Sequence, residues 1–348
     1  MDDRKCLNHR FEKYCRFCVD ICPHNAVTYT GRINVDETRC SGCGICAVAC
    51  PARCLEIPEP DWETVLNKAL EHPKPCLGCQ RSLSGTTTIF VPCTGALPEE
   101  LLAAISVLRG SEFGLDLTGC FECPQKTGLR QLQRSLFRAR FITGGNLKFT
   151  AILPERDSNK KDSTLNYDHL VVLGRNFKKV SESLVNTMLP RELNSSPSAE
   201  NRSLPRELLL KILPPNREGS IKLTSFKVDQ NCTGCAFCQG VCPHKAWELV
   251  YKENSAVLSH YPLRCTDCGL CASACPQKAK HKISIDWSVG TDRPLESRCF
   301  QAGICTDCHK PVLVNKSSMP LCPSCKNRRK LQESIREEIT RSQVPASF

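Results

Sequence analysis

The stretch "CTGCAFCQGVCP", residues 232–243, decides the fold class of this chain. It follows the pattern C-x2-C-x2-C-x3-C-P, which returns as "CTDCGLCASACP" at 265–276 and as "CSGCGICAVACP" at 40–51. Three cysteines in a tight loop can surround one face of an iron–sulfur cubane while backbone amides point at its sulfides. The fourth cysteine begins a helix or turn, and the proline keeps that helix from running back into the cluster. Three copies of so strict a pattern predict clusters bound by thiolates.

These runs resemble those of bacterial dicluster ferredoxins, over residues 1–58 and 222–287. In that family the fourth cysteine of each run ligates the cluster of the other run. For the second module the resemblance implies one [4Fe–4S] cluster on Cys232, Cys235, Cys238 and Cys275, and another on Cys265, Cys268, Cys271 and Cys242.

The partner run in the amino-terminal module is distorted. In "CRFCVDICPHNA" the place of the first cysteine is taken by Glu12, while Cys6 lies upstream and can loop in as a substitute. A three-iron or absent cluster with a free Cys6, or a carboxylate ligand from Glu12, stays open. The resemblance implies one cluster on Cys6, Cys15, Cys18 and Cys50, and another on Cys40, Cys43, Cys46 and Cys22.

The composition agrees with metal-bound thiols. Of 348 residues, 27 are cysteine and only 6% are aromatic, so small cores need support other than apolar burial. The start "MDDRKCLNHRFEKYC" has no apolar signal core, and no stretch of about 18 apolar residues exists, so we expect a cytoplasmic protein without a membrane span. The net charge of +11 is weak evidence for nucleic acid, because each oxidised cubane with four thiolates carries about −2.

Between the two modules, "KPCLGCQ" at 74–80 belongs to a second set of cysteines. After it, apolar strand patterns alternate with helical ones in the order β-α-β-α-β, which predicts a parallel sheet. Sites in such sheets form beyond the carboxyl ends of the strands. Five thiols are expected to converge there: Cys76, Cys79, Cys93, Cys120 and Cys123.

The order CxxC, VPCTG and GC-x-x-C resembles the small iron–sulfur subunit associated with heterodisulfide reductases and hydrogenases, over residues 72–150. That family has a parallel α/β fold and a [2Fe–2S] centre, and it passes electrons between larger partners. The end of its last motif is replaced here by "CFECPQ", so the ligand set stays open. Zinc or a redox-active thiol pair are the alternatives. The favoured set is Cys76, Cys79, Cys120 and Cys123, with Cys93 as competitor.

The tail contains two further CxxC pairs. A short hairpin with two such pairs predicts a zinc ribbon, although a single iron has the same ligand requirement. A charged helix follows in "KNRRKLQESIREEIT", and Cys54 and Cys299 remain unassigned as buried or free thiols. The ribbon ligands are Cys305, Cys308, Cys322 and Cys325.

Together these features predict an α+β multidomain protein that transfers electrons. The sequence contains no glycine-rich motif for nucleotide binding and no recognisable arrangement of catalytic side chains. We therefore expect a non-catalytic subunit that relays single electrons between partner proteins. Such partners would be a hydrogenase, a formate dehydrogenase or a heterodisulfide-reductase-like enzyme. Two alternatives are a reductase site in the middle crevice and a redox-sensing nucleic-acid binder that uses Arg328, Arg329 and Lys330. The expected domains are the ferredoxin modules at 1–58 and 221–290, the parallel α/β domain at 72–153, a polar linker at 154–220, and the zinc ribbon with helix at 299–348.

Overall fold

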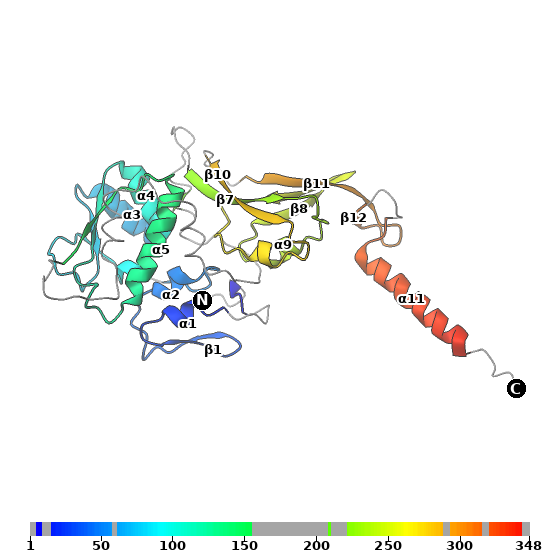
Figure 1. The fold of residues 1–348 in the computed structure, drawn as a ribbon, viewed down its shortest axis with the longest axis horizontal. Helices are drawn as coiled ribbons and strands as arrows, with labels where there is room; N and C mark the ends of the chain where they lie inside the picture. Colours follow the sequence, from blue (N-terminus) through cyan, green and yellow to red (C-terminus); the bar gives the residue numbers. More distant parts are fainter. Residues whose placement is uncertain are drawn as a thin grey trace.

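The computed structural model describes residues 5–8, 15–57, 61–154, 208–209, 221–287, 293–314 and 320–342. The expected linker lies almost entirely outside these ranges, as does Glu12. The middle domain (residues 61–153) and the second module (221–287) lie side by side, the amino-terminal module (5–57) lies against both, and helix α11 extends away from them (Figure 1). Among the helices that are described, none has the length and apolar character needed to cross a membrane.

The amino-terminal module consists of two short helices and one hairpin. Helices α1 (Phe17–Ile21) and α2 (Ile45–Ala49) are each followed by a cysteine and a proline. Proline lacks the N–H that a continuing helix needs, so each helix stops after little more than one turn and leaves its cysteine at the end. Strands β1 (Val27–Tyr29) and β2 (Ile33–Val35) form the antiparallel hairpin between them.

The second module repeats this order and adds a longer hairpin. Strand β7 (Ile221–Val228) precedes the repeat and β10 (Lys280–Trp287) follows it, and the two pair antiparallel over their full lengths. The core of the module is a small cluster around Trp247, Phe226 and several cysteines, as the low aromatic content predicts. The repeated elements are α9 (Phe237–Val241), β8 (Trp247–Tyr251), β9 (Ser255–His260) and α10 (Leu270–Ser273).

The middle domain is a parallel α/β unit, which confirms the prediction from the alternating patterns. Its strands β3 (Cys76–Gly78), β4 (Ile89–Phe90), β5 (Phe113–Asp116) and β6 (Phe149–Ile152) form one parallel sheet in the order β4-β3-β5-β6. The "CLGC" pair therefore supplies a strand that the sequence patterns did not predict.

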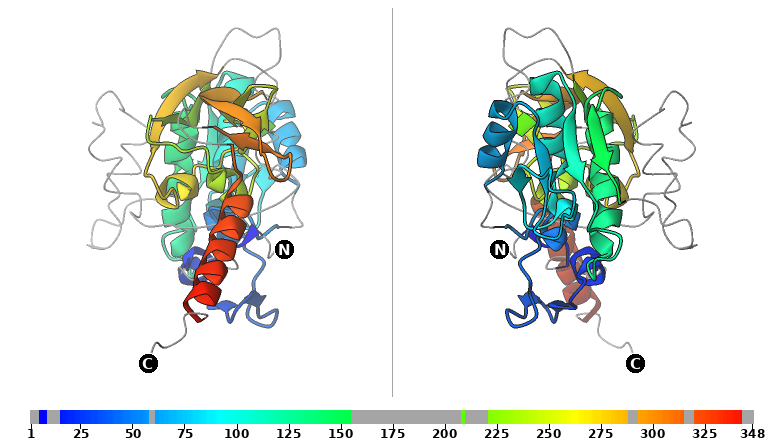
Figure 2. Two further views of the ribbon diagram at one scale, coloured as in Figure 1. Left: turned by 90° about the vertical axis from the view of Figure 1, so that its right-hand side faces the viewer. Right: turned by 90° about the vertical axis from the view of Figure 1, so that its left-hand side faces the viewer.

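Three helices form the core of this domain with the sheet. Helix α4 (Glu99–Arg109) packs against α3 (Trp62–Glu71) and α5 (Thr127–Ile142), and their leucines enclose Leu77 and Leu115 of the sheet. The Asp61 carboxylate caps the first turn of α3 by accepting the N–H groups of Glu63 and Thr64. Figure 2 shows these helices lying beside the sheet.

A network of charged side chains joins the three units. The guanidinium of Arg53, from the amino-terminal module, lies 2.9 Å from Glu99 and 3.3 Å from Glu100 at the start of α4. Glu99 also accepts a 3.0 Å hydrogen bond from Arg138 of α5, which donates to the Thr266 carbonyl at 2.9 Å and lies 3.8 Å from Asp267 in the second module. Because Arg53, Glu99 and Glu100 are buried, these pairs require a fixed docking of the units.

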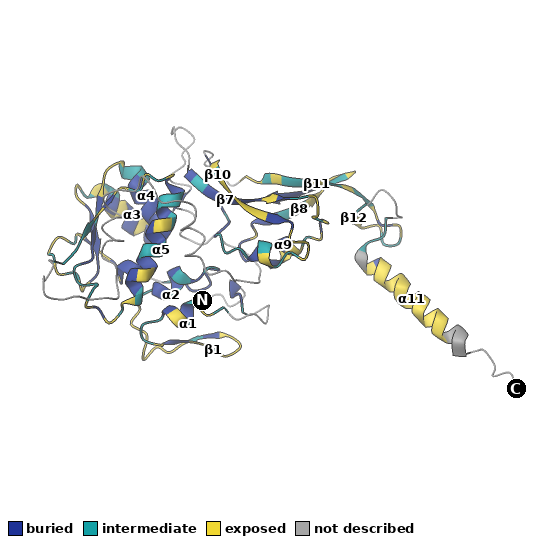
Figure 3. Ribbon diagram, in the orientation of Figure 1, coloured by how far each residue is buried: buried dark blue, intermediate teal, exposed yellow. Residues whose placement is uncertain are grey.

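The tail continues the sheet of the second module. Strand β11 (Leu295–Ile304) pairs first with β9 and then with β12 (Pro311–Leu313), so one sheet of order β12-β11-β9-β8 runs through both regions. The tail is thus attached through a shared strand rather than placed as a separate domain. Helix α11 (Pro323–Ser342) then projects outward, and its described side chains beyond Cys325 are exposed (Figure 3).

Candidate metal centres

Five groups of cysteines are candidate metal centres, apart from the tail. Site A is Cys22, Cys40, Cys43 and Cys46; site B is Cys6, Cys15, Cys18 and Cys50; site C is Cys242, Cys265, Cys268 and Cys271; site D is Cys232, Cys235, Cys238 and Cys275. The middle site is defined by the structure as Cys79, Cys93, Cys120 and Cys123.

In the second module the two runs approach each other. Burial, together with repulsion from Cys265, raises the pKa of Cys242 to about 12, and repulsion from Cys242 acts in the same way on Cys268. Cys242, the fourth cysteine of the first run, therefore lies with the thiols of the second run. Cys238 has Cys232 and Cys235 as its sulfur neighbours, and Cys275 follows α10 as Cys242 follows α9.

A buried lysine in this module fits an anionic cluster. Lys280 is 7% exposed, its ammonium lies 3.2 Å from the ring centroid of Trp247, and its charge acts on the Cys238 thiol against the effect of burial. A buried ammonium is costly unless a negative group neutralises it. A thiolate-bound cluster at site D would supply that negative charge.

Each cysteine run ends in a cysteine followed by a proline, and we call the turn that begins there a Cys-Pro corner. The four corner cysteines are Cys22, Cys50, Cys242 and Cys275. Backbone amides point at the sulfurs of these corners. Asn25, Arg53, Lys245 and Lys278, each three residues after a corner cysteine, have left-handed φ angles of 48–49°. This turn directs the next N–H back at the cysteine, and the Ala26 and Ala246 amides donate to Cys22 and Cys242 Sγ at 3.3 Å. Such donors stabilise a metal-bound thiolate and tune its potential.

The thiols of site B line a small cavity, together with one thiol that the sequence left unassigned. The lining includes Cys6, Cys15, Cys18 and Cys50, and also Cys54, which is 1% exposed. Burial raises the pKa of Cys18 to about 12, so this thiol stays protonated at neutral pH until a metal displaces the proton.

At site A, Cys46 has Cys43, Cys22 and Cys40 as its sulfur neighbours, and burial raises its pKa to about 12. Cys40 is exposed, so this group reaches the protein surface.

The middle site lies at the carboxyl edge of the parallel sheet. Cys79 follows β3, Cys93 follows the β4 region, and Cys120 and Cys123 follow β5, and the four line one cavity of about 170 Å³. This is the edge at which parallel α/β sheets form their sites. The Gly95 N–H donates to Cys93 Sγ and the Gln125 N–H to Cys123 Sγ, each at 3.4 Å.

The structure does not bring Cys76 to this cavity. Cys76 is the first residue of β3, and its Sγ lies 3.9 Å from the Thr86 hydroxyl and against Gly114. Side chains alternate between the two faces of a strand, so residues three apart in a strand point to opposite faces. Cys76 lies within β3 and Cys79 just after its end, and Cys93 rather than Cys76 lines the cavity with Cys79, Cys120 and Cys123.

The middle site adjoins site A. Gln125 Nε2 lies 3.1 Å from His24 Nε2 and donates to the Ser41 hydroxyl at 3.2 Å. Cys43 is a sulfur neighbour of Cys93, and Ile45 packs with Cys93 in one apolar cluster. Ser41, which directly follows Cys40 of site A, thus contacts the wall of the middle site.

The remaining sites form one series. Cys18 of site B has Cys46 of site A among its sulfur neighbours. Cys268 and Leu270 of the second module pack in the same apolar cluster as Cys18 and Cys50, and the Thr266 hydroxyl donates to the Pro51 carbonyl at 3.0 Å. Because Cys238 of site D is among the sulfur neighbours of Cys242 of site C, the order in space is middle site, A, B, C, D.

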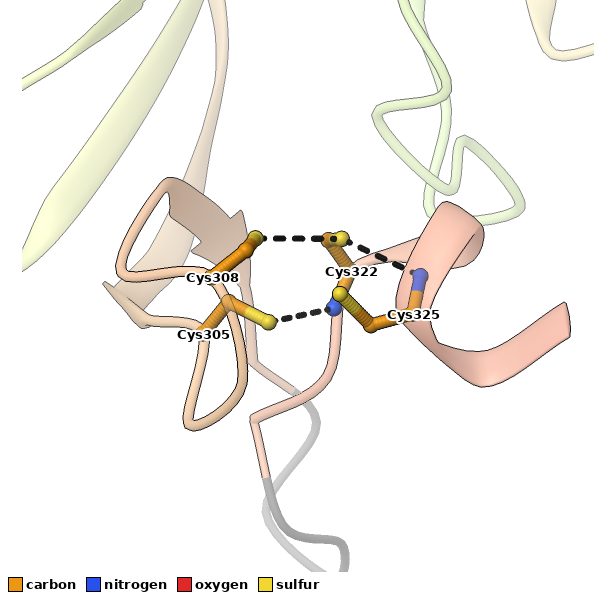
Figure 4. Close-up of side chains that lie close together, drawn as sticks. All are labelled: Cys305, Cys308, Cys322 and Cys325. Atoms are coloured by element: carbon orange, nitrogen blue, oxygen red, sulfur yellow. Dashed lines mark hydrogen bonds between the residues drawn. The ribbon is translucent and has the colours of Figure 1, made fainter. Parts of the chain in front are cut away.

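The four cysteines of the tail suit a single ion. Their Sγ atoms all lie within 4.8 Å of one another, with Cys308 and Cys322 at 3.6 Å (Figure 4). Tetrahedral bonds of about 2.3 Å from zinc to sulfur would place sulfurs about 3.8 Å apart. The Cys322 N–H donates to Cys305 Sγ at 3.3 Å and is the main cause that lowers the pKa of Cys305 to about 6.

The basic residues after this site are engaged within the chain. Arg329 forms two hydrogen bonds with the Asp307 carboxylate, one of them 2.9 Å long, and Arg328 lies 3.9 Å from the same carboxylate. Arg328 also contacts Cys325 Sγ at 3.7 Å. Two of the three basic residues considered for nucleic-acid binding therefore fasten α11 to the loop between Cys305 and Cys308.

Comparison with known families supports the two ferredoxin modules. The family described as "4Fe-4S dicluster domain" matches this chain twice, at residues 13–54 and 231–279. A comparison with curated proteins finds no match. Two regions of the chain therefore carry the pattern of an iron–sulfur dicluster domain, and the matched regions include the corner cysteines of sites A to D.

Proposed function

We propose that this protein is an iron–sulfur relay that carries single electrons between partner proteins of a redox complex. A cubane bound at each of sites A to D would supply reversible one-electron chemistry. The observation that carries the proposal is the contact between the modules, in which cysteines of sites B and C share one apolar cluster. A relay needs neighbouring centres without a gap, and a carrier with two independent modules would not need this contact.

The exposure of the thiols also supports a relay between partners. The described thiols of site B and the Cys265 and Cys271 thiols of site C are largely covered, whereas Cys40 of site A and Cys235 of site D are exposed. Centres near the two ends of the series can therefore meet partners, while the inner ones are shielded from water.

For the middle site we favour a [2Fe–2S] centre on Cys79, Cys93, Cys120 and Cys123, which would extend the relay beyond site A. Zinc is the alternative, since four thiolates suit both. For the tail we propose structural zinc on Cys305, Cys308, Cys322 and Cys325, because two thiol pairs around one small space leave no coordination position open.

Metal analysis of the anaerobically purified full chain, with EPR of the reduced sample, tests the proposal. Four cubanes predict about 16 irons per chain, and a [2Fe–2S] centre raises the count to about 18 with one zinc. Reduced centres in one series should also show magnetic coupling between the modules. About 16 irons with two zincs would remove the middle site from the relay. A count far below 16, or turnover of a disulfide substrate by the chain alone, would contradict the proposed function.

A further inference from the structure

The position of Cys54 sets one Cys-Pro corner apart from the other three. The residue four places after the corner cysteine is Ala26, Ala246 or Ala279 in three corners, each at most 1% exposed. In the fourth corner, after Cys50, it is Cys54. The equivalent backbone position, with its N–H directed at the corner sulfur, therefore carries a thiol only at site B.

Site B is also the site whose first expected cysteine is missing. Cys15 and Cys18 correspond to Cys235 and Cys238 of site D, and the residue that corresponds to Cys232 is Glu12. An additional thiol and a missing thiol thus coincide at one of the four sites. In the structure the Cys54 sulfur lies 3.3 Å from Cys50 Sγ, and both line the cavity with Cys15 and Cys18.

Cys6 is held at the same cavity by contacts of its own segment. The Asn8 side chain donates to the Cys15 carbonyl at 2.7 Å and accepts the Cys15 N–H at 2.6 Å, and the Tyr29 hydroxyl donates to the Asn8 carbonyl at 2.9 Å. These bonds fasten the segment that contains Cys6 onto the module. Cys6 is 6% exposed and lines the cavity with Cys54. Five thiols therefore surround a site that needs four.

We propose that site B is completed by either of two thiols, Cys6 or Cys54, in addition to Cys15, Cys18 and Cys50. In an exchange, the Cys54 sulfur forms the iron–sulfur bond as that of Cys6 breaks, and the Cys54 thiol proton passes to the Cys6 sulfur. No electron is gained or lost, and no further reactant is needed. The inference rests on the proposed function, because it assumes that the site holds a cubane.

This arrangement gives the relay an adjustable centre at its middle. Site B lies between site A and the second module, and Cys54 follows Arg53, whose guanidinium holds the docking network. Cys54 is next to Arg53 of the docking network, whereas the Cys6 segment is held by the hydrogen bonds of Asn8. A change in docking therefore acts directly on Cys54. The potential of the centre depends on which thiol binds, since hydrogen bonds and burial around the ligand differ.

Cysteine variants of the full chain test the inference. We compare wild type, Cys6→Ala, Cys54→Ala and the double variant, purified anaerobically, by iron content and by the EPR signal of an oxidised [3Fe–4S] cluster. Cys54→Ala restores the residue found in the other three corners, so it should fold. Each single variant should keep the iron content of wild type, and the double variant should show about one three-iron spin per chain.

The outcomes separate this inference from the proposed function. A full three-iron signal in one single variant, with none in the other, would show a single fixed fourth ligand and overturn the inference alone. Four irons at site B in the double variant would also overturn it, because another group would then complete the site. Wild-type protein without iron at any of the four sites would refute the proposed function itself.

A transplant into site D checks the geometry independently. Cys232→Ala removes the residue equivalent to Glu12 and should produce a three-iron signal. Adding Ala279→Cys places a thiol where Cys54 stands in site B, and it should lower that signal at least about fivefold by restoring the fourth iron. A signal unchanged by Ala279→Cys would mean that a thiol at this corner does not reach the cluster, and the inference would fail.

Discussion

At the scale of single residues, the side chains that face the thiols are the ones that can tune a bound centre. Lys280 is buried beside Cys238, and its ammonium lies over Trp247. His260 also packs against Trp247, with ring centroids 4.6 Å apart. A buried cation and a buried imidazole thus contact the same aromatic side chain, and each leads to its own prediction.

Removing the Lys280 charge should lower the reduction potential of site D. A unit charge within about 10 Å of the centre contributes about 1–2 kcal/mol at an effective dielectric constant of about 20, or about 50–90 mV for one electron. We therefore expect Lys280→Met to lower the potential of one cubane by that amount in an EPR-monitored titration. Lys227→Met removes an exposed charge from β7 and is the control. Equal potentials in Lys280→Met and wild type would contradict this assignment.

His260 should make the second module sensitive to mild acid. Burial, aided by the Lys280 charge, lowers the pKa of His260 to about 3, while its unfolded value is 6.5. The imidazole is neutral in both states above pH 6.5, and below it the unfolded chain binds the extra proton, so the free energy of unfolding falls as the pH decreases from about 6.5 towards 3.

Between pH 7.5 and 5.5 the His260 contribution should reduce the free energy of unfolding by about 1.4 kcal/mol. Anaerobic urea unfolding of wild type and His260→Gln measures this as a difference in slope. The Gln side chain can still interact with Ser225, whose hydroxyl lies 2.9 Å from His260 Nδ1. Identical pH dependences for the two proteins would rule out His260 as the titrating group.

At the scale of elements, the middle site depends on the close approach of the short 3-10 helix η2 (Thr94–Ala96) to α5. A Cβ atom on Gly95 would lie 2.5 Å from backbone atoms of Gly128, and one on Gly128 would lie 3.2 Å from Cys93 Sγ. Two glycines face to face therefore let the loop after Cys93 rest on the first turn of α5.

Gly95→Ala should disrupt the middle site while leaving the ferredoxin modules loaded. Forcing a methyl group into this contact costs about 1–3 kcal/mol and displaces Cys93. The expected result is the loss of the metal of the middle site from the total metal content, with the cubane signals unchanged. Gly240→Ala in α9 is the control, because a Cβ there meets nothing within 4 Å. A middle site with full metal content in Gly95→Ala would refute this dependence.

At the scale of the whole molecule, the charged network decides whether the centres form one series. Arg138 bridges Glu99 of its own domain to Thr266 and Asp267, and Asp267 lies between two cysteines of site C. Lys282 adds a 2.6 Å contact to Asp267 from β10. The docking of the second module is thus tied to the loop that would hold one of its clusters.

Arg138→Met should weaken this docking. Removing Arg138 takes one positive charge away from the buried carboxylates of Glu99 and Glu100, which then share Arg53, and costs at most about 3–5 kcal/mol. We expect a lower denaturation midpoint and loss of magnetic coupling between the modules, with iron content retained. Arg16→Met breaks an exposed pair with Asp20, worth at most about 1 kcal/mol, and serves as the control. Intact coupling in Arg138→Met would show that other contacts hold the modules together.

Local features of the chain could be predicted from the sequence alone. The cluster-binding loops depend on cysteines that are at most four residues apart, and the strands β4, β5 and β6 and the helices α4 and α5 depend on periodic patterns, so both could be predicted. The assignment of ligands at each site stays a prediction, as does the identity of each metal. The strand formed by Cys76–Gly78 was missed because three residues carry too short a pattern to distinguish a strand from a metal knuckle.

What only the tertiary structure decided is which distant thiols meet. Cys93 joins Cys79, Cys120 and Cys123 because three strands end at one edge, and Cys54 and Cys6 line one cavity only in the folded amino-terminal module. The series from the middle site to site D likewise depends on a network of charged side chains. It runs from Arg53 through Glu99 and Arg138 to Asp267, which is 214 positions after Arg53 in the chain. Contacts of this kind follow from the packing of whole units, because neither spacing nor composition records which surfaces become neighbours.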